Sequence, residues 1–187
     1  MSAPPAAGPA GFYYADVPNR AIAYIIDAII LFVINIVVGI VLAAIIGPTV
    51  SLNANATDPN NLVTVNYGAT LIGAIVSTAI SGAYFVYTWT SMRASPGQKI
   101  LGMQVGNESD GATLTMNQAV TRWILLGAPF GLASALNPLP VIGLLIGLAG
   151  LVWFIALLVT TAQSPTKQGL HDRYAHTVVV KAARAVG

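Results

Sequence analysis

Four long apolar runs, separated by short polar segments, dominate the pattern of this chain. They cover residues of about 21–46, 67–90, 117–136 and 141–161. The first run has 26 residues, of which only Asp27 and Asn35 are strongly polar, whereas roughly 20 apolar residues suffice to cross a hydrocarbon core of about 30 Å. The pattern therefore predicts an all-α membrane protein, built as a four-transmembrane-helix bundle.

Local signals mark the start and the middle of the third run. Thr115 and Gln118 have the spacing of a capping box, in which a hydroxyl and an amide satisfy free backbone donors where a helix begins. Pro129 has no amide proton and is expected to kink the helix, which frees the carbonyl of Leu125. We expect this run to cross the membrane, with a re-entrant hairpin as the alternative.

The charged residues indicate how the runs are oriented. They make up 7% of the chain, against roughly 25% in a soluble domain. All Lys and Arg residues fall on one side of the predicted map: Arg20, Arg93, Lys99, Arg122, Lys167, Arg173, Lys181 and Arg184. Short cytoplasmic loops are enriched in Lys and Arg, so both termini are expected in the cytoplasm. Because the net charge is only +2 and is spread around membrane segments, no nucleic-acid partner is expected.

The remaining segments are short. Residues 1–18 predict a disordered N-terminal tail and residues 182–187 a C-terminal tail, which leaves one domain over 19–181. Residues 100–105 predict a strand that forms a short cytoplasmic hairpin with a second extended piece, through a turn at Asp110 and Gly111. The cytoplasmic C-terminal tail that follows the fourth run includes a β-branched stretch at 177–180, ahead of residues 182–187. These two segments are expected to lie against the membrane face or against each other.

Three sequence segments together resemble a known family. They are an arginine and an aspartate seven residues apart at the start of the first run, the segment SPGQKILGMQV after the second run, and QGLHDRYAHTVVV after the fourth. This combination resembles the RDD family of small bacterial membrane proteins, named after one arginine and two aspartates. By motif, the family's three residues correspond to Arg20, Asp27 and Asp172. The resemblance implies a multi-pass protein of the bacterial inner membrane, and transport, including sodium/proton antiport, has been attributed to some members.

Asp27 is the first candidate for a functional residue. A carboxylate at membrane depth is costly and usually faces a protein interior, a partner or an aqueous path. Counting inward from the cytoplasmic ends of the runs, Ser81, Tyr84 and the freed carbonyl of Leu125 reach a similar depth. Together with Asp27 they form a candidate ion or proton site. The alternative is that Asp27 is a protonated or hydrogen-bonded packing residue, because burial neutralises a carboxyl group.

A second candidate cluster is expected at the cytoplasmic surface. Arg20 lies about 10 Å from Asp27 along a helix, which is too far for a direct ion pair. It is expected to reach lipid phosphate or a cytoplasmic carboxylate, for which Asp172 is the best candidate. With His171 and Arg173, these residues predict a cytoplasmic polar lock that also contacts anionic lipid headgroups.

Two functions remain open at this point. The first is a small ion or proton transporter, or a transport component, that uses Asp27. The second is a non-enzymatic accessory or scaffolding subunit of a larger membrane complex, or a homo-oligomer, whose small-xxx-small helix faces bind partners. The chain has no cysteine and few carboxylates, so no enzymatic activity, cofactor or metal site is expected.

Overall fold

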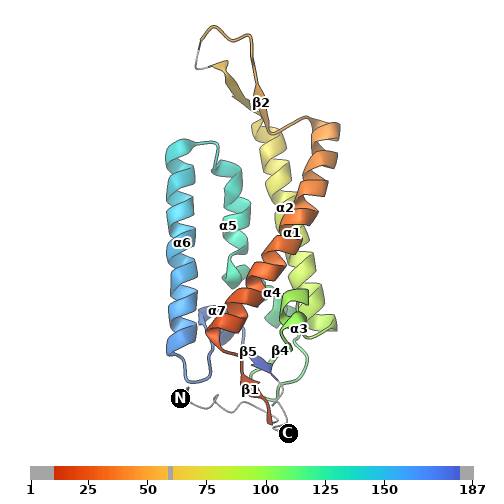
Figure 1. The fold of residues 1–187 in the computed structure, drawn as a ribbon, viewed down its shortest axis with the longest axis vertical. Helices are drawn as coiled ribbons and strands as arrows, with labels where there is room; N and C mark the ends of the chain where they lie inside the picture. Colours follow the sequence, from red (N-terminus) through yellow and green to blue (C-terminus); the bar gives the residue numbers. More distant parts are fainter. Residues whose placement is uncertain (1–10, 59–60, 182–187) are drawn as a thin grey trace.

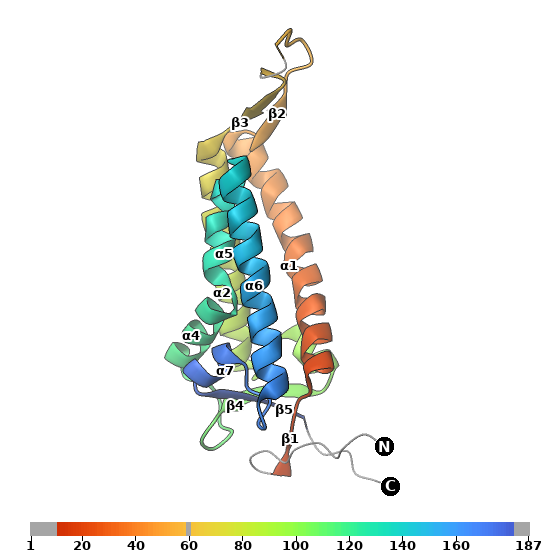
Figure 2. The ribbon, with the colours of Figure 1, turned by 90° about the vertical axis from the view of Figure 1, so that its left-hand side faces the viewer.

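Long helical segments run side by side between two small sheets, one at each end of the molecule (Figures 1 and 2). The computed structural model describes residues 11–58 and 61–181. The long helices are α1 (Val17–Ile46), α2 (Tyr67–Ser91) and α6 (Pro140–Gln163), and a further segment is built from α4 (Met116–Leu126), α5 (Ala128–Ala133) and η3 (Ser134–Leu136).

Membrane-spanning length is present in three of these helices, or in four segments if the bent one is counted. α1 begins at the side chain of Asp16, which accepts from the amide of Asn19, and ends at Gly47 with a positive φ of 85°. Along α1, large apolar side chains such as Phe32 and Ile40 are two-thirds exposed. A helix whose outer face is this apolar is suited to lipid rather than water.

The bent segment contains the expected kink. α4 and α5 meet at an angle of 52°, and the break falls at Gly127, whose φ of 134° is a conformation that side chains other than glycine rarely adopt. Pro129 occupies the first turn of α5, where its missing amide proton costs nothing. The carbonyl of Leu125 accepts a hydrogen bond from Nε1 of Trp153 at 2.9 Å, so a side chain already uses it.

A three-stranded antiparallel sheet closes one end of the molecule, which we call the sheet end. Its order is β1 (Tyr13–Tyr14), β5 (Thr177–Lys181), β4 (Met103–Asn107). The predicted hairpin after the second run is therefore wrong: β4 pairs with β5, with Gly106 opposite Val178, and residues 112–115 form no strand. The chain is mostly helical rather than all-α. Burial of the β-branched residues of β5 favours this long-range pairing over a local turn.

Two short helices and a distant hairpin complete the fold. α3 (Pro96–Ile100) and α7 (Leu170–Tyr174) lie at the sheet end, whereas β2 (Val50–Leu52) and β3 (Val63–Val65) form a hairpin at the other end, the hairpin end. The buried core lies at the sheet end and includes Phe85, Trp89, Met103, Val105 and Val179.

Part of the predicted N-terminal tail belongs to the fold. Of the segment 1–18 that we expect to be disordered, residues 1–10 lie outside the described part of the chain. The prediction is wrong for the end of this segment, because Tyr13 and Tyr14 pair with β5, Ala15 is fully buried and α1 begins at Val17. The predicted C-terminal tail, 182–187, also lies outside the described residues.

Candidate functional site

Asp27 is held by three neutral hydrogen-bond donors. Its side chain is 2% exposed. Oδ1 accepts from the hydroxyl of Tyr84 at 2.7 Å and from the backbone amide of Gly97 at 2.8 Å, and Oδ2 accepts from the hydroxyl of Ser95. The carboxylate therefore ties α1 to α2 and to the start of α3.

The segment before β4 is folded so that it fits onto Asp27. Ser95 caps α3, and a capping box links it to Gln98, whose Oε1 also accepts from Nε1 of Trp89 at 3.1 Å. Gly97 packs so closely on α1 that a Cβ at this position would overlap the carbonyl oxygen of Ala23. Only a glycine lets the amide at the start of α3 reach the carboxylate, where the partial positive charge of a helix start favours an anion.

The predicted ion or proton site is only partly assembled around Asp27. Tyr84 contacts the carboxylate. Ser81 instead accepts a hydrogen bond from Nε1 of Trp123 at 3.2 Å, and the carbonyl of Leu125 is bonded to Trp153. Sequence reasoning missed Ser95 and Gly97, although S-P-G-Q has the same capping-box form as the segment that begins α4.

Asp172 is held by two arginines. Its side chain is fully buried; Oδ2 lies 2.6 Å from Nη1 of Arg20, and Oδ1 contacts Nη1 of Arg122. Arg20 also donates to the backbone carbonyls of Ala15 at 3.0 Å and Val179 at 3.3 Å. One carboxylate thus joins the start of α1 to α4, and the fork of Arg20 extends the connection to β5.

Arg122 is the main residue that sequence reasoning missed at this site. It is 3% exposed, donates to Oγ1 of Thr177 at 2.6 Å and lies over the ring of Trp89 at 5.0 Å. A signal was present, because Arg122 is the only Lys or Arg inside the four apolar runs. A charge within such a run is costly and calls for a partner.

Of the other two predicted members of the lock, His171 lies inside the cluster and Arg173 lies outside it. Nε2 of the buried His171 lies 3.6 Å from Oδ2 of Asp172. Burial and the positive charges of Arg122 and Arg20 lower the pKa of His171 to about 4, although the negative charge of Asp172 acts in the opposite direction. The ring is therefore neutral at pH 7. Arg173 is exposed and lies outside the cluster.

The charge state of Asp172 follows from its neighbours. Burial alone would raise the pKa of its carboxyl group, but Arg122 and Arg20 hold that pKa well below its usual range. Asp172 is therefore ionised at neutral pH. In the part of the chain that the structure describes, no group of three or more His, Cys, Asp or Glu side chains is placed to hold a metal ion.

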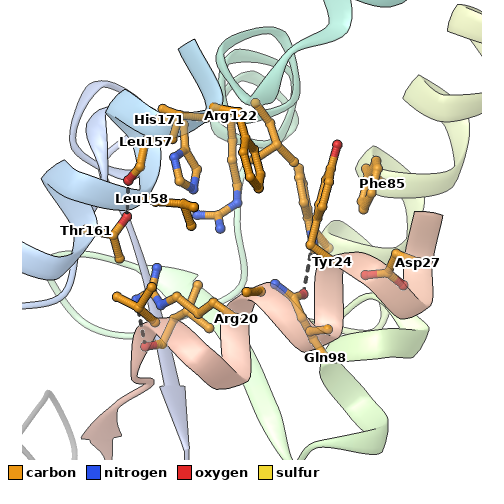
Figure 3. Close-up of a pocket in the computed structure, with 17 residues that line it drawn as sticks. Arg20, Tyr24, Asp27, Phe85, Gln98, Arg122, Leu157, Leu158, Thr161 and His171 are labelled. Carbon is orange, nitrogen blue, oxygen red and sulfur yellow. Dashed lines mark hydrogen bonds between the residues drawn. The ribbon is translucent and has the colours of Figure 1, made fainter. Parts of the chain in front are cut away.

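Two of the cavities between the described helices adjoin the site. The first, which we call the charged cavity, has a volume of about 90 Å³, and Figure 3 shows it between Arg20, Arg122 and His171, with Asp27 on its wall. The second, the hydroxyl cavity, has a volume of about 320 Å³ and is lined by polar side chains and by backbone near the α4–α5 break: Asn35, Ser77, Thr78, Ser81 and Gly127. Both cavities are lined by Tyr24, Phe85 and Leu126. They are therefore neighbours with a shared wall.

The model of the RDD family matches residues 14–176. The chain belongs to the RDD family. The resemblance seen in the sequence is thereby confirmed, and the match extends from β1 to the residue before β5. No curated protein and no solved structure matches the chain.

The RDD residues occupy two separate places in this protein. Arg20 and Asp172, far apart in the sequence, form an ion pair at the sheet end. Asp27 lies on the same helix as Arg20 but bonds to a different set of partners on α2 and α3. In this RDD protein, the arginine and the second aspartate join the start of α1 to α7, whereas the first aspartate joins α1 to α2 and α3.

Proposed function

We propose that this RDD protein is a small transport component of the bacterial inner membrane that moves a proton or a small cation, with Asp27 as the group that carries the proton or contacts the cation. The observation that carries the proposal is the pair of cavities inside the bundle, which share a wall at Tyr24, Phe85 and Leu126. Asp27 lines the first cavity, and the hydroxyl groups of Ser77, Thr78 and Ser81 line the second.

The proposed orientation places the sheet end in the cytoplasm, with four segments crossing the bilayer and both termini inside. Three arginines at the sheet end support it: Arg20 near the start of α1, Arg93 just before α3, and Arg122 of α4, which contacts Asp172 of α7 and Thr177 of β5. An excess of Lys and Arg is typical of the cytoplasmic side. Under this orientation the charged cavity is the cytoplasmic entrance and the hydroxyl cavity lies deeper in the bilayer.

Asp27→Asn is a sharp test because the structure shows how asparagine fits. Its Oδ1 can accept from Tyr84 and Gly97, as the carboxylate does, while its Nδ2 donates to the hydroxyl of Ser95. The substitution removes titration and keeps the contacts. Asp110→Asn, at an exposed position in the loop after β4, makes the same chemical change away from the cavities.

The experiment measures proton and sodium flux into proteoliposomes of the purified protein under an imposed pH gradient. We expect flux from the wild type and from Asp110→Asn, and loss of flux from a folded Asp27→Asn. Wild-type flux in Asp27→Asn would remove Asp27 from the mechanism. Absence of both proton and sodium flux from folded wild-type protein under the pH gradient would overturn the transport proposal.

A specific observation favours a second function, a non-enzymatic accessory or scaffolding subunit of a larger membrane complex or homo-oligomer. Nothing lies within 4 Å of the Cβ position of Gly39, Gly73 or Gly147, so small-residue patches on α1, α2 and α6 are open to a partner helix. Under this function, Gly73→Leu reduces cross-linking or co-purification of a partner, and Asp27→Asn leaves assembly unchanged. Unchanged assembly in Gly73→Leu and Gly147→Leu would contradict it.

A further inference from the structure

The charged cavity has room for more than one water molecule. Its volume of about 90 Å³ is several times the roughly 10–15 Å³ that one water molecule needs. Arg20 and Arg122 lie on opposite sides of it in Figure 3, and Leu157 and Leu158 of α6 form an apolar part of its wall. The rings of Tyr24 and Phe154, 6.3 Å apart, also belong to that wall.

The two buried arginines at this cavity share one ion-paired carboxylate. Arg20 and Arg122 bring two positive charges, Asp172 brings one negative charge, and His171 is neutral at pH 7. Asp27 also lines the cavity, but its oxygens accept from neutral donors on α2, α3 and the residue before α3 rather than from an arginine. Because a buried charge is stabilised by a direct ion pair, an anion bound in the cavity would give the second arginine a partner of its own.

One donor at this place has no acceptor. Nη1 of Arg122 is bonded to Asp172 and Thr177, whereas its Nε–H is buried and has no hydrogen-bond partner. Arg122 as a whole is 97% buried, since its exposed fraction is 3%. A buried guanidinium N–H without an acceptor is rare in a folded protein, and an oxygen of a bound ligand would satisfy it.

We propose that the charged cavity binds a phosphate-bearing group, with Arg20 and Arg122 as its cationic contacts and the Nε–H of Arg122 as a donor to a phosphate oxygen. Guanidinium groups pair well with phosphate because several N–H donors match its oxygens. A tetrahedral phosphate presents oxygens in several directions, so it can meet arginines on two sides of a cavity. The ligand is either the phosphodiester of a membrane lipid or a soluble phosphate.

This binding site shares the charged cavity with the proposed transport route, but phosphate binding does not require a proton or cation to move through Asp27. We therefore expect phosphate binding even in a protein that shows no flux. The two proposals therefore fail independently of each other.

The test measures the thermal midpoint of the purified protein in detergent with defined additives. The two probes are inorganic phosphate and a short-chain phosphatidylglycerol with six-carbon acyl chains. The controls are sodium chloride at matched ionic strength and the corresponding diacylglycerol, which lacks phosphate. We expect at least one phosphate probe to raise the midpoint by about 3–6 °C at saturation, and neither control to do so.

Ala21→Leu is the variant that links the shift to the cavity. Ala21 lines the charged cavity, so a leucine there fills space without changing charge. Ala28→Leu is the matched control, because Ala28 lies on the same helix and lines the hydroxyl cavity. Lys99→Gln, at an exposed basic residue, controls for surface attraction. The phosphate-dependent shift should disappear in Ala21→Leu and persist in the other two variants.

The outcomes separate the two sources of phosphate. A shift with the lipid alone identifies a headgroup site, and a shift with inorganic phosphate identifies a site that soluble phosphate can enter. Either result supports the proposal if Ala21→Leu abolishes it. The proposal is overturned if neither probe shifts the wild type, if sodium chloride or diacylglycerol gives the same shift, or if Ala21→Leu responds like the wild type.

Discussion

Asp27 and Asp172 are both buried carboxylates, yet they are stabilised in opposite ways. Asp27 accepts from two hydroxyl groups and one amide, and all three donors are neutral. Asp172 is ion-paired to two arginines. The difference shows that loss of negative charge should be tolerated at the first site and severely destabilising at the second, because only the second leaves buried cations behind.

Asp172→Asn should have the largest effect. The amide leaves the guanidinium groups of Arg20 and Arg122 buried without a counter-charge, and breaking a buried ion pair in this way costs about 3–5 kcal/mol. The measurement is the free energy of unfolding in detergent micelles, with Asp110→Asn as the exposed control. A loss below about 1 kcal/mol, the range of exposed ion pairs, would contradict the charge-paired interpretation of Asp172.

The pH dependence of stability should separate His171 from Asp172. Unfolded histidine has a pKa of about 6.5, whereas that of folded His171 is about 4. As pH falls from about 6.5 to about 4, protons bind the unfolded chain first, and stability falls by up to about 3 kcal/mol. The lowered pKa of Asp172 acts at lower pH, because its contribution is present above the unfolded value of about 3.9 and is lost below it.

Thermal midpoints of the wild type and His171→Gln, measured across this range, check the assignment. The glutamine variant should lose the decline between pH 6.5 and 4 and keep the decline below pH 4. Parallel curves for the two proteins would show that folding does not lower the pKa of His171.

Gly97→Ala should perturb the Asp27 site without changing any charge. A Cβ at this position overlaps the backbone carbonyl of Ala23, and backbone cannot move away as a side chain can. Overpacking of this kind costs about 1–3 kcal/mol. The matched control is Gly73→Ala on α2, where the Cβ position is open; this change should be neutral or slightly stabilising. Equal stability of the two variants would contradict the close packing of α3 on α1.

Asp27→Asn should have the smallest effect on stability, within about 1 kcal/mol, because the amide can serve the same three partners. Asp27→Ala is its counterpart and should cost about 2–3 kcal/mol, since Tyr84, Ser95 and Gly97 lose their acceptor. Unfolding of all three proteins in one detergent gives the comparison. A large loss in Asp27→Asn would show that the charge itself matters there, as it does at Asp172.

The helices were predictable from the sequence because membrane insertion leaves a local signal. The apolar runs, the capping box at Thr115 and the kink at Pro129 each depend on neighbouring residues, and each corresponds to an observed helix or break. The contact between Arg20 and Asp172 was predictable for another reason, since both were expected at one membrane surface. Counting residues inward from the cytoplasmic ends of the runs also predicted that Tyr84 lies at the depth of Asp27, where the two side chains are in contact.

The missed features depend on contacts between residues distant in the sequence. Contact between the segments of β4 and β5 was one of two expected alternatives, but no turn signal near residue 110 could show that β4 pairs with β5 rather than with its own neighbour. Ser95 and Gly97 reach Asp27 because α3 packs on α1, and depth counting included only the long helices. Arg122 was visible as a charge in an apolar run, but Asp172 was already assigned to Arg20, and a carboxylate with two oxygens can bind both.

The position of β5 has a consequence for biogenesis. It is the central strand of the sheet, yet the ribosome makes it, together with Asp172, after every long helix. During translation, Arg20 and Arg122 therefore exist for a period without their carboxylate, and β1 and β4 have no strand between them. A nascent chain that stops before residue 172 would display two arginines without their carboxylate and two strand edges without β5 between them.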